Sequence, residues 1–85
     1  MRYEGEWKNG MRNGKGRLVS PNGKVYEGNF KNNKREGRGS IFKQGDKIFE
    51  GLFKDNKAHG KGLSFKKDGT SVETTWKNGV FSTEN

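Results

Sequence analysis

The segment Tyr3-Glu4-Gly5-Glu6-Trp7-Lys8-Asn9 decides the fold of this chain, because its pattern returns at a constant interval. Later copies occupy residues 26–32, 49–55 and 72–78, so successive copies start 23 residues apart. Each copy has an aromatic residue at its fifth position and a glutamate at its second. A fixed period of this length is the signature of a repeat architecture. We therefore interpret residues 1–85 as one array, with units 3–25, 26–48 and 49–71 and a partial unit 72–85.

The composition fits a repeat array better than a conventional globular core. Only 26% of the residues are hydrophobic and 14 are glycine, which leaves little material for a large core. Low hydrophobicity with a net charge of +8 is typical of disordered chains, but the aromatic residues here follow a single period. Because each repeat packs on its neighbours, such an array needs less core per residue and becomes stable at about three units.

Within each copy, residue types alternate with period two, which predicts a half-buried β-strand. Tyr3, Gly5 and Trp7 then share one face of the strand, and the charged residues share the other. The pair Asn9-Gly10 that follows is a strong hairpin signal, and a second apolar stretch follows each of the first three turns. We expect an all-β, elongated, single-layer antiparallel hairpin ribbon of about seven short strands.

The predicted core consists of aromatic rings that lie over glycines. A glycine carries no side chain, so a ring can lie flat against its backbone. The residues assigned to this structural core are Tyr3, Trp7, Tyr26, Phe30, Phe49, Phe53 and Trp76, together with Gly5, Gly28 and Gly51.

These features resemble the MORN repeat, the membrane occupation and recognition nexus. The resemblance rests on the Tyr-x-Gly-x-Trp/Phe strand, the Asn-Gly turn and the Gly-x-Gly triplets, and it covers nearly the whole chain. The last unit departs from the pattern at Val72 and Thr74. The resemblance implies a hairpin solenoid that acts as a scaffold or adaptor for a protein partner in a cytoskeletal or ciliary assembly. It also implies an alternative role as the regulatory part of a larger enzyme, such as a lipid kinase or methyltransferase.

The sequence predicts no enzyme and no catalytic, metal or cofactor-binding residues. The Gly-x-Gly triplets are similar to phosphate-binding loops, but each leads into a predicted strand rather than a helix. His59 is the only histidine, and no carboxylate or serine stands in a fixed relation to it, so we assign it to packing or turn chemistry. The repeated glutamates are best explained as a solvated charge ladder.

Two sets of residues are candidates for binding. Strict alternation places Val25, Ile48 and Leu52 opposite the rings, where an exposed aliphatic patch would mark a protein contact. A groove over the rings or an open strand edge would offer a peptide a further place to bind. The alternative partner is an acidic phospholipid or phosphoinositide membrane, bound at about 1 kcal/mol per basic residue by a ladder of cations. This ladder consists of Lys8, Lys15, Lys31, Arg38, Lys54 and Lys61.

Charge and composition also bear on location and on other partners. The chain has no cysteine, no apolar leader after Met1 and no membrane-spanning apolar run, so we expect a cytoplasmic protein. Within the cytoplasm, the cytoskeleton, a cilium or a membrane surface are the expected places. Nucleic acid is disfavoured as a partner, because rings and lysines on opposite faces cannot contact one strand together.

Overall fold

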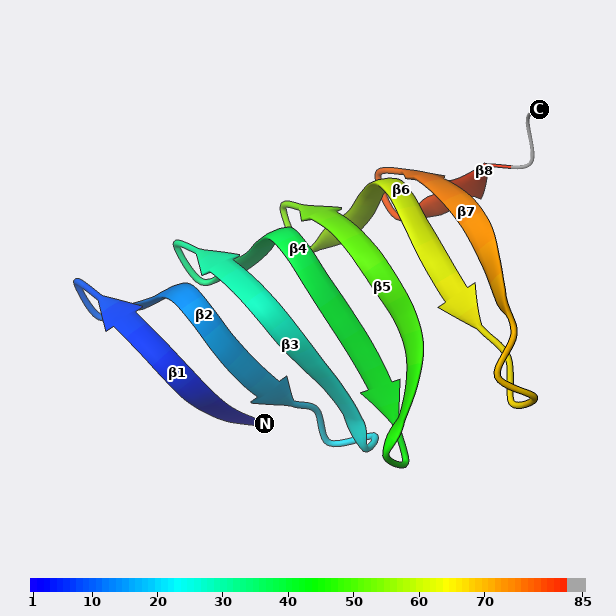
Figure 1. The fold of residues 1–85 in the computed structure, drawn as a ribbon. Coiled ribbons are helices and arrows are strands. Elements are labelled where there is room, and N and C mark those ends of the chain that lie inside the picture. The colour runs from blue at the N-terminus through cyan, green and yellow to red at the C-terminus, as the bar shows by residue number, and fades with distance from the viewer. Residues whose placement is uncertain (83–85) are drawn as a thin grey trace.

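Residues 1–82 form one antiparallel sheet of eight strands in the computed structural model, with no helix among them (Figure 1). The strands are β1 (Arg2–Lys8), β2 (Met11–Val19), β3 (Lys24–Lys31), β4 (Lys34–Lys43), β5 (Asp46–Lys54), β6 (Lys57–Phe65), β7 (Ser71–Lys77) and β8 (Val80–Ser82). Neighbours in sequence pair in the order β1 to β8, so the sheet is a succession of hairpins. This confirms the predicted ribbon. The number of strands exceeds the expected seven because β8 follows the turn at Asn78-Gly79.

The first turn of each repeat has the backbone conformation that its sequence predicts. Asn9 and Gly10 have φ angles of 52° and 75°, and Asn32 and Asn33 have φ angles of 49° and 70°. Two consecutive positive φ angles are characteristic of the type I′ turn, whose twist matches that of the strands it joins. Turns of this kind join β1 to β2, β3 to β4, β5 to β6 and β7 to β8.

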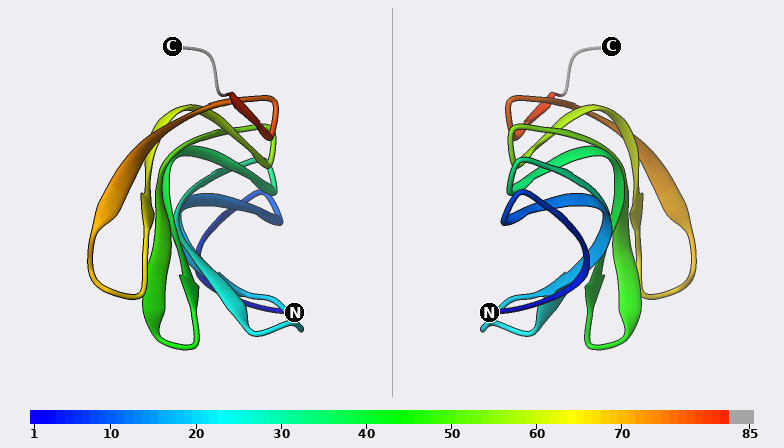
Figure 2. Two further views of the ribbon diagram at one scale, coloured as in Figure 1. Left: turned by 90° about the vertical axis from the view of Figure 1, so that its right-hand side faces the viewer. Right: turned by 90° about the vertical axis from the view of Figure 1, so that its left-hand side faces the viewer.

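A single row of small residues crosses the sheet at right angles to the strands. The strand pairing aligns Gly5, Gly16, Gly28, Gly39, Gly51, Gly62 and Thr74. In β1, β3 and β5 the register shifts between the glycine and the following aromatic residue, which marks a β-bulge. Bulges bend strands, and Figure 2 shows that the strands are strongly curved.

The aromatic rings pack on one face of the sheet over this glycine row. Tyr26, Phe30, Phe49 and Phe53 are the buried hydrophobic residues of the described chain, with 4–7% of their surface exposed. A Cβ atom placed on Gly62 would lie 2.7 Å from the Phe49 ring, so the ring occupies space that only glycine leaves free. Consecutive rings meet edge to face, which is a favourable arrangement of aromatic quadrupoles.

Trp7 is an edge residue rather than the core residue that the repeat pattern predicts. Its side chain is 59% exposed, and it contacts Tyr3 with a ring separation of 4.9 Å. In the next repeat the equivalent ring, Phe30, is also covered by the tyrosine of the repeat before it. Trp7 lies in β1, at the edge of the sheet, where no preceding ring covers it.

Burial raises the pKa of Tyr26 to about 12, and the nearby Arg35 partly opposes this shift. Because the pKa in the folded protein lies above the ordinary value of 10.0, ionisation favours the unfolded chain. The stabilisation by the neutral ring is therefore complete below pH 10 and is lost as the pH rises towards 12. We expect Tyr26→Phe to remove this part of the alkaline loss in unfolding free energy, measured by urea titration between pH 8 and pH 12. Phe49 occupies the equivalent position in the next repeat, so phenylalanine fits this site. An unchanged pH dependence of the unfolding free energy in the variant would contradict this account.

Candidate functional site

A groove of about 1200 Å³ runs across the sheet on the face opposite the rings. Its floor is the glycine row, and none of its lining residues is aromatic within the part of the chain that the structure describes. The lining side chains come from β1 through β7, and they stand in two lines, one on each side of the floor. The glycine row thus has two roles, because it seats the rings on one face and leaves the other face open.

One wall of the groove is acidic. Cross-strand pairing produces the line Glu4, Arg17, Glu27, Ser40, Glu50, Leu63 and Glu73. The Arg17 Nε atom lies 3.1 Å from a carboxylate oxygen of Glu27. The Lys47 Nζ atom donates to Glu50 at 2.7 Å, and this hydrogen bond lowers the pKa of the Glu50 carboxyl. The four glutamates outnumber the nearby cations Arg2, Arg17 and Lys47, so this wall keeps a net negative charge.

The opposite wall is basic. It consists of three cross-strand pairs, which are Lys15 with Asn29, Arg38 with Leu52, and Lys61 with Thr75. Leu52 is 42% exposed, and Leu63 lines the groove from the acidic wall. The β5–β6 part of the groove therefore adds an apolar surface to its two charged margins.

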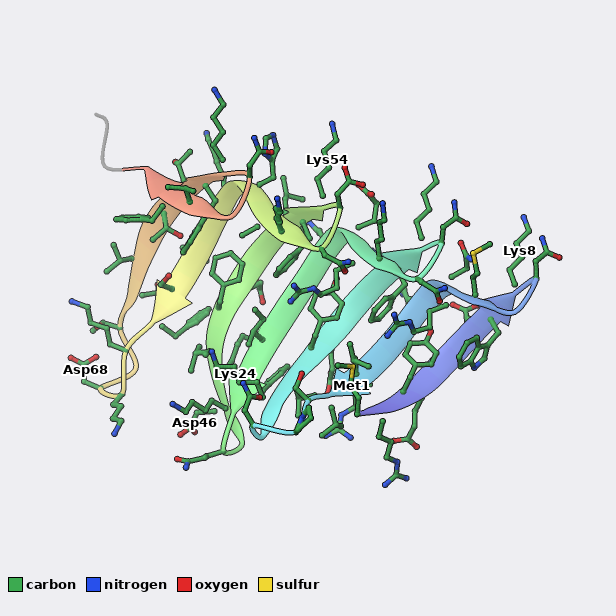
Figure 3. The ribbon with its side chains drawn as sticks, turned by 180° about the vertical axis from the view of Figure 1, so that it is seen from behind. Met1, Lys8, Lys24, Asp46, Lys54 and Asp68 are labelled. Atoms are coloured by element: carbon green, nitrogen blue, oxygen red, sulfur yellow. The ribbon has the colours of Figure 1, made fainter. Side chains whose placement is uncertain are left out.

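The six predicted lipid-binding cations occupy two places on the sheet. Lys15, Arg38 and Lys61 line the groove, whereas Lys8, Lys31 and Lys54 lie at the edge that carries the Asn-Gly type turns. Figure 3 shows Lys8 and Lys54 pointing away from the sheet at this edge.

The turn edge is more basic than the sequence prediction indicates. Lys31 pairs with Lys34, Lys54 pairs with Lys57, and Lys77 occupies the same position in β7. Asp55 is the one acidic residue in these four turns, and it lies 3.9 Å from the Lys34 Nζ atom. We call the six lysines of these turns the lysine edge. They are Lys8, Lys31, Lys34, Lys54, Lys57 and Lys77.

The predicted aliphatic patch is not assembled as strict alternation requires. Leu52 lines the groove, but Val25 and Ile48 do not. In the pairing of β4 with β5, Phe49 faces Ile41 and Lys47 faces Phe42, so Ile48 is the extra residue of a bulge. A bulge interrupts the alternation on which the prediction depended.

Leu63 is the apolar groove residue that sequence reasoning missed. It takes the place that Arg17 and Ser40 hold in the earlier repeats, and this change from polar to apolar was the available signal. His59 takes part in turn chemistry, because its Nδ1 atom accepts a hydrogen bond from the Asn78 amide at 3.2 Å. Residues 1–82 contain no group of three or more His, Asp or Glu residues placed to hold a metal ion, and no helix long and apolar enough to cross a membrane.

Comparison with known families gives three matches to the MORN repeat, over residues 3–25, 26–47 and 49–71. A search of curated proteins finds no significant match. The three matches cover most of the chain, and they coincide with the first three ring-over-glycine hairpin units of the sheet. The chain therefore belongs to the MORN repeat family.

Proposed function

We propose that this chain is a non-enzymatic adaptor that binds a polypeptide segment in the groove opposite the rings. MORN repeats are modules for interaction with proteins or membranes, which sets the general class. The observation that favours a polypeptide is the opposite charge of the two walls. A uniformly anionic surface would be attracted by Lys15, Arg38 and Lys61 but repelled by the glutamates across the floor.

The walls also indicate the chemistry of the segment. Basic side chains would face the glutamate wall, acidic side chains would face the lysine and arginine wall, and an apolar stripe would contact Leu52 and Leu63. An amphipathic helix presents such stripes side by side along its length. The four central rings on the other face, Tyr26, Phe30, Phe49 and Phe53, are buried by the fold, so they offer little surface to such a segment.

The groove can be tested with peptides selected from a displayed library of amphipathic sequences on the intact protein at physiological salt. We expect Leu52→Ser to weaken binding of the selected peptides by about 10-fold or more, as for a central apolar contact. The matched control is Lys31→Ser with Lys54→Ser, which alters the lysine edge and should change affinity by less than about twofold. Isothermal titration measures both. Equal losses in the two variants would overturn the groove as the binding site.

A second candidate function, binding to acidic membranes, is favoured by the lysine edge. Six lysines with one aspartate share this edge, and exposed basic residues add about 1 kcal/mol each near anionic lipid. We expect the protein to sediment with phosphatidylserine and phosphoinositide vesicles at low salt. Lys31→Ser with Lys54→Ser should weaken this binding by on the order of 30-fold.

The control for membrane binding removes the same charge from the groove, with Lys15→Ser and Lys61→Ser. This pair should have the smaller effect, because the facing glutamates already oppose lipid contact there. Vesicle binding that is absent at low and physiological salt would exclude this second function. Equal weakening by both pairs would exclude the lysine edge as its cause.

A further inference from the structure

The guanidinium of Arg12 contacts two aromatic rings, those of Tyr3 and Phe30. The rings of Tyr3 and Phe30 meet edge to face with centroids 5.2 Å apart. The guanidinium carbon of Arg12 lies 5.8 Å from the first centroid and 5.6 Å from the second, within the range of cation–π attraction. Its Nη2 atom donates to the carbonyl oxygen of Asn33 at 2.9 Å. The guanidinium is therefore held by two rings and one backbone carbonyl, and its Nε atom also donates to the Asn33 Oδ1 atom at 3.4 Å.

Arg35 repeats this arrangement 23 residues later. The Tyr26 and Phe53 centroids are 5.1 Å apart, and the Arg35 guanidinium carbon lies 5.6 Å and 5.2 Å from them. The guanidinium also donates to the carbonyl oxygen of Asn56. The same three elements thus hold a guanidinium in two successive repeats.

The third repeat keeps the holding elements but has no arginine. The rings of Phe49 and Trp76 meet edge to face with centroids 5.7 Å apart, and the residue in the arginine position is Ala58. A hollow of about 450 Å³ lies at this place, bordered by both rings, Ala58 and Gly79. Phe49 is only 7% exposed, so most of the accessible ring surface belongs to the half-buried Trp76.

The backbone acceptor is also in register. The amide of Gly79 donates to the carbonyl of Ala58 at 2.8 Å, and the corresponding bond from Asn33 to Arg12 measures 3.0 Å. Gly79 therefore occupies the position of the asparagines whose carbonyl oxygens accept from a guanidinium in the earlier repeats. The hollow differs from the two filled sites by the absence of the long side chain and of the asparagine side chain, whose Oδ1 atom accepts from the backbone amides of Arg12 and Arg35.

We propose that this hollow binds the guanidinium group of an arginine side chain from a polypeptide other than this chain. A guanidinium stacks on aromatic faces and is more weakly hydrated than an ammonium, and tryptophan is the strongest aromatic partner for a cation. Arg35 and Lys57 also border the hollow, so the incoming cation meets some repulsion, which salt screens. The site lies on the ring face, so it does not depend on the groove proposed above.

The test is an NMR titration of the labelled full chain at physiological salt with N-acetyl-arginine amide. The matched probe is N-acetyl-citrulline amide, which has nearly the same shape but no charge. We expect shifts at the Ala58 methyl, the Gly79 amide and the Trp76 indole N–H, which donates to Thr74 at 2.9 Å. The arginine probe should bind between about threefold and 30-fold more tightly than the citrulline probe. Equal affinity for the two probes would show that the hollow does not select a guanidinium.

The variant Ala58→Arg supplies the missing side chain from within. We expect it to fold, to unfold at a higher temperature than the wild type and to lose the response to the arginine probe. Leu52→Ser, in the groove, should retain that response. A failure of Ala58→Arg to fold, or an undiminished response in this variant, would overturn the proposal. Self-association of the wild type that Ala58→Arg abolishes would assign the arginine to a second copy of the chain and overturn the choice of partner.

Discussion

Gly39→Ala is expected to lower the free energy of unfolding by about 3 kcal/mol or more. Gly39 lies in β4 under the Tyr26 ring, and an added Cβ atom would overlap that ring. The φ angle of Gly39 is not positive, so the effect comes from the ring and not from the backbone conformation. Displacing a buried aromatic ring costs about 3 kcal/mol or more, a large part of the stability of a small domain.

The matched control is Gly45→Ala, in the turn between β4 and β5. Gly45 has a φ angle of 85° and no atom within 4 Å of an added Cβ, so the substitution strains only the backbone. We expect this variant to remain folded with a loss of about 1–2 kcal/mol. Circular dichroism during urea unfolding measures both variants. A loss for Gly39→Ala no greater than that for Gly45→Ala would show that the rings do not depend on the glycine row.

Phe53→Ala is expected to lower the free energy of unfolding by about 3–5 kcal/mol. Phe53 is 4% exposed, its centroid lies 5.1 Å from that of Tyr26, and Arg35 covers its ring. The alanine variant would leave a cavity and remove one of the two rings that Arg35 contacts. Thermal and urea unfolding of the same protein preparation give the loss.

Trp7→Ala is the matched control for Phe53→Ala, because both residues occupy the fifth position of their repeat. Trp7 is 59% exposed at the edge of the sheet, so we expect a loss below about 1.5 kcal/mol. The sequence pattern alone predicts equal losses. Equal measured losses would therefore contradict the edge position of Trp7.

Much of the fold is predictable from the sequence, because the same local patterns of alternation, turn residues and glycines recur in every repeat. The alternation around Tyr26, the positive φ angles at Asn32-Asn33 and the Gly-x-Gly triplets each depend on residues close together in the chain. Edge effects are not predictable in this way. Trp7 belongs to the repeat by its type, but its burial depends on a ring from a neighbouring unit.

The candidate site was harder to predict, because it depends on register between strands. Alternation assigns Leu52 to the face opposite the rings, but it does not show that the glycines of six strands line up as an open floor. One extra residue at Ile48 also breaks the alternation, and no local signal marks that bulge. The sequence shows that Ala58 replaces the arginine of the first two repeats. Only the contacts of Arg12 and Arg35 with the rings show that this replacement leaves a hollow.

Specificity in this array should lie where equivalent positions of the repeats differ. The glutamates of the acidic wall are constant, whereas Arg17, Ser40 and Leu63 succeed one another between them. On the basic wall, Leu52 stands where the neighbouring repeats have Asn29 and Thr75. These changes make the β5–β6 part of the groove its most apolar region. A partner segment would therefore be held in register by one apolar contact and by charge on both sides.

The most direct test of the groove is a cross-saturation NMR footprint of a selected peptide on the labelled wild-type protein. The account predicts saturation transfer to residues of both walls, centred on Leu52 and Leu63, with little transfer to Phe30 and Phe53 on the opposite face. A footprint centred on the ring face or on the lysine edge would contradict it.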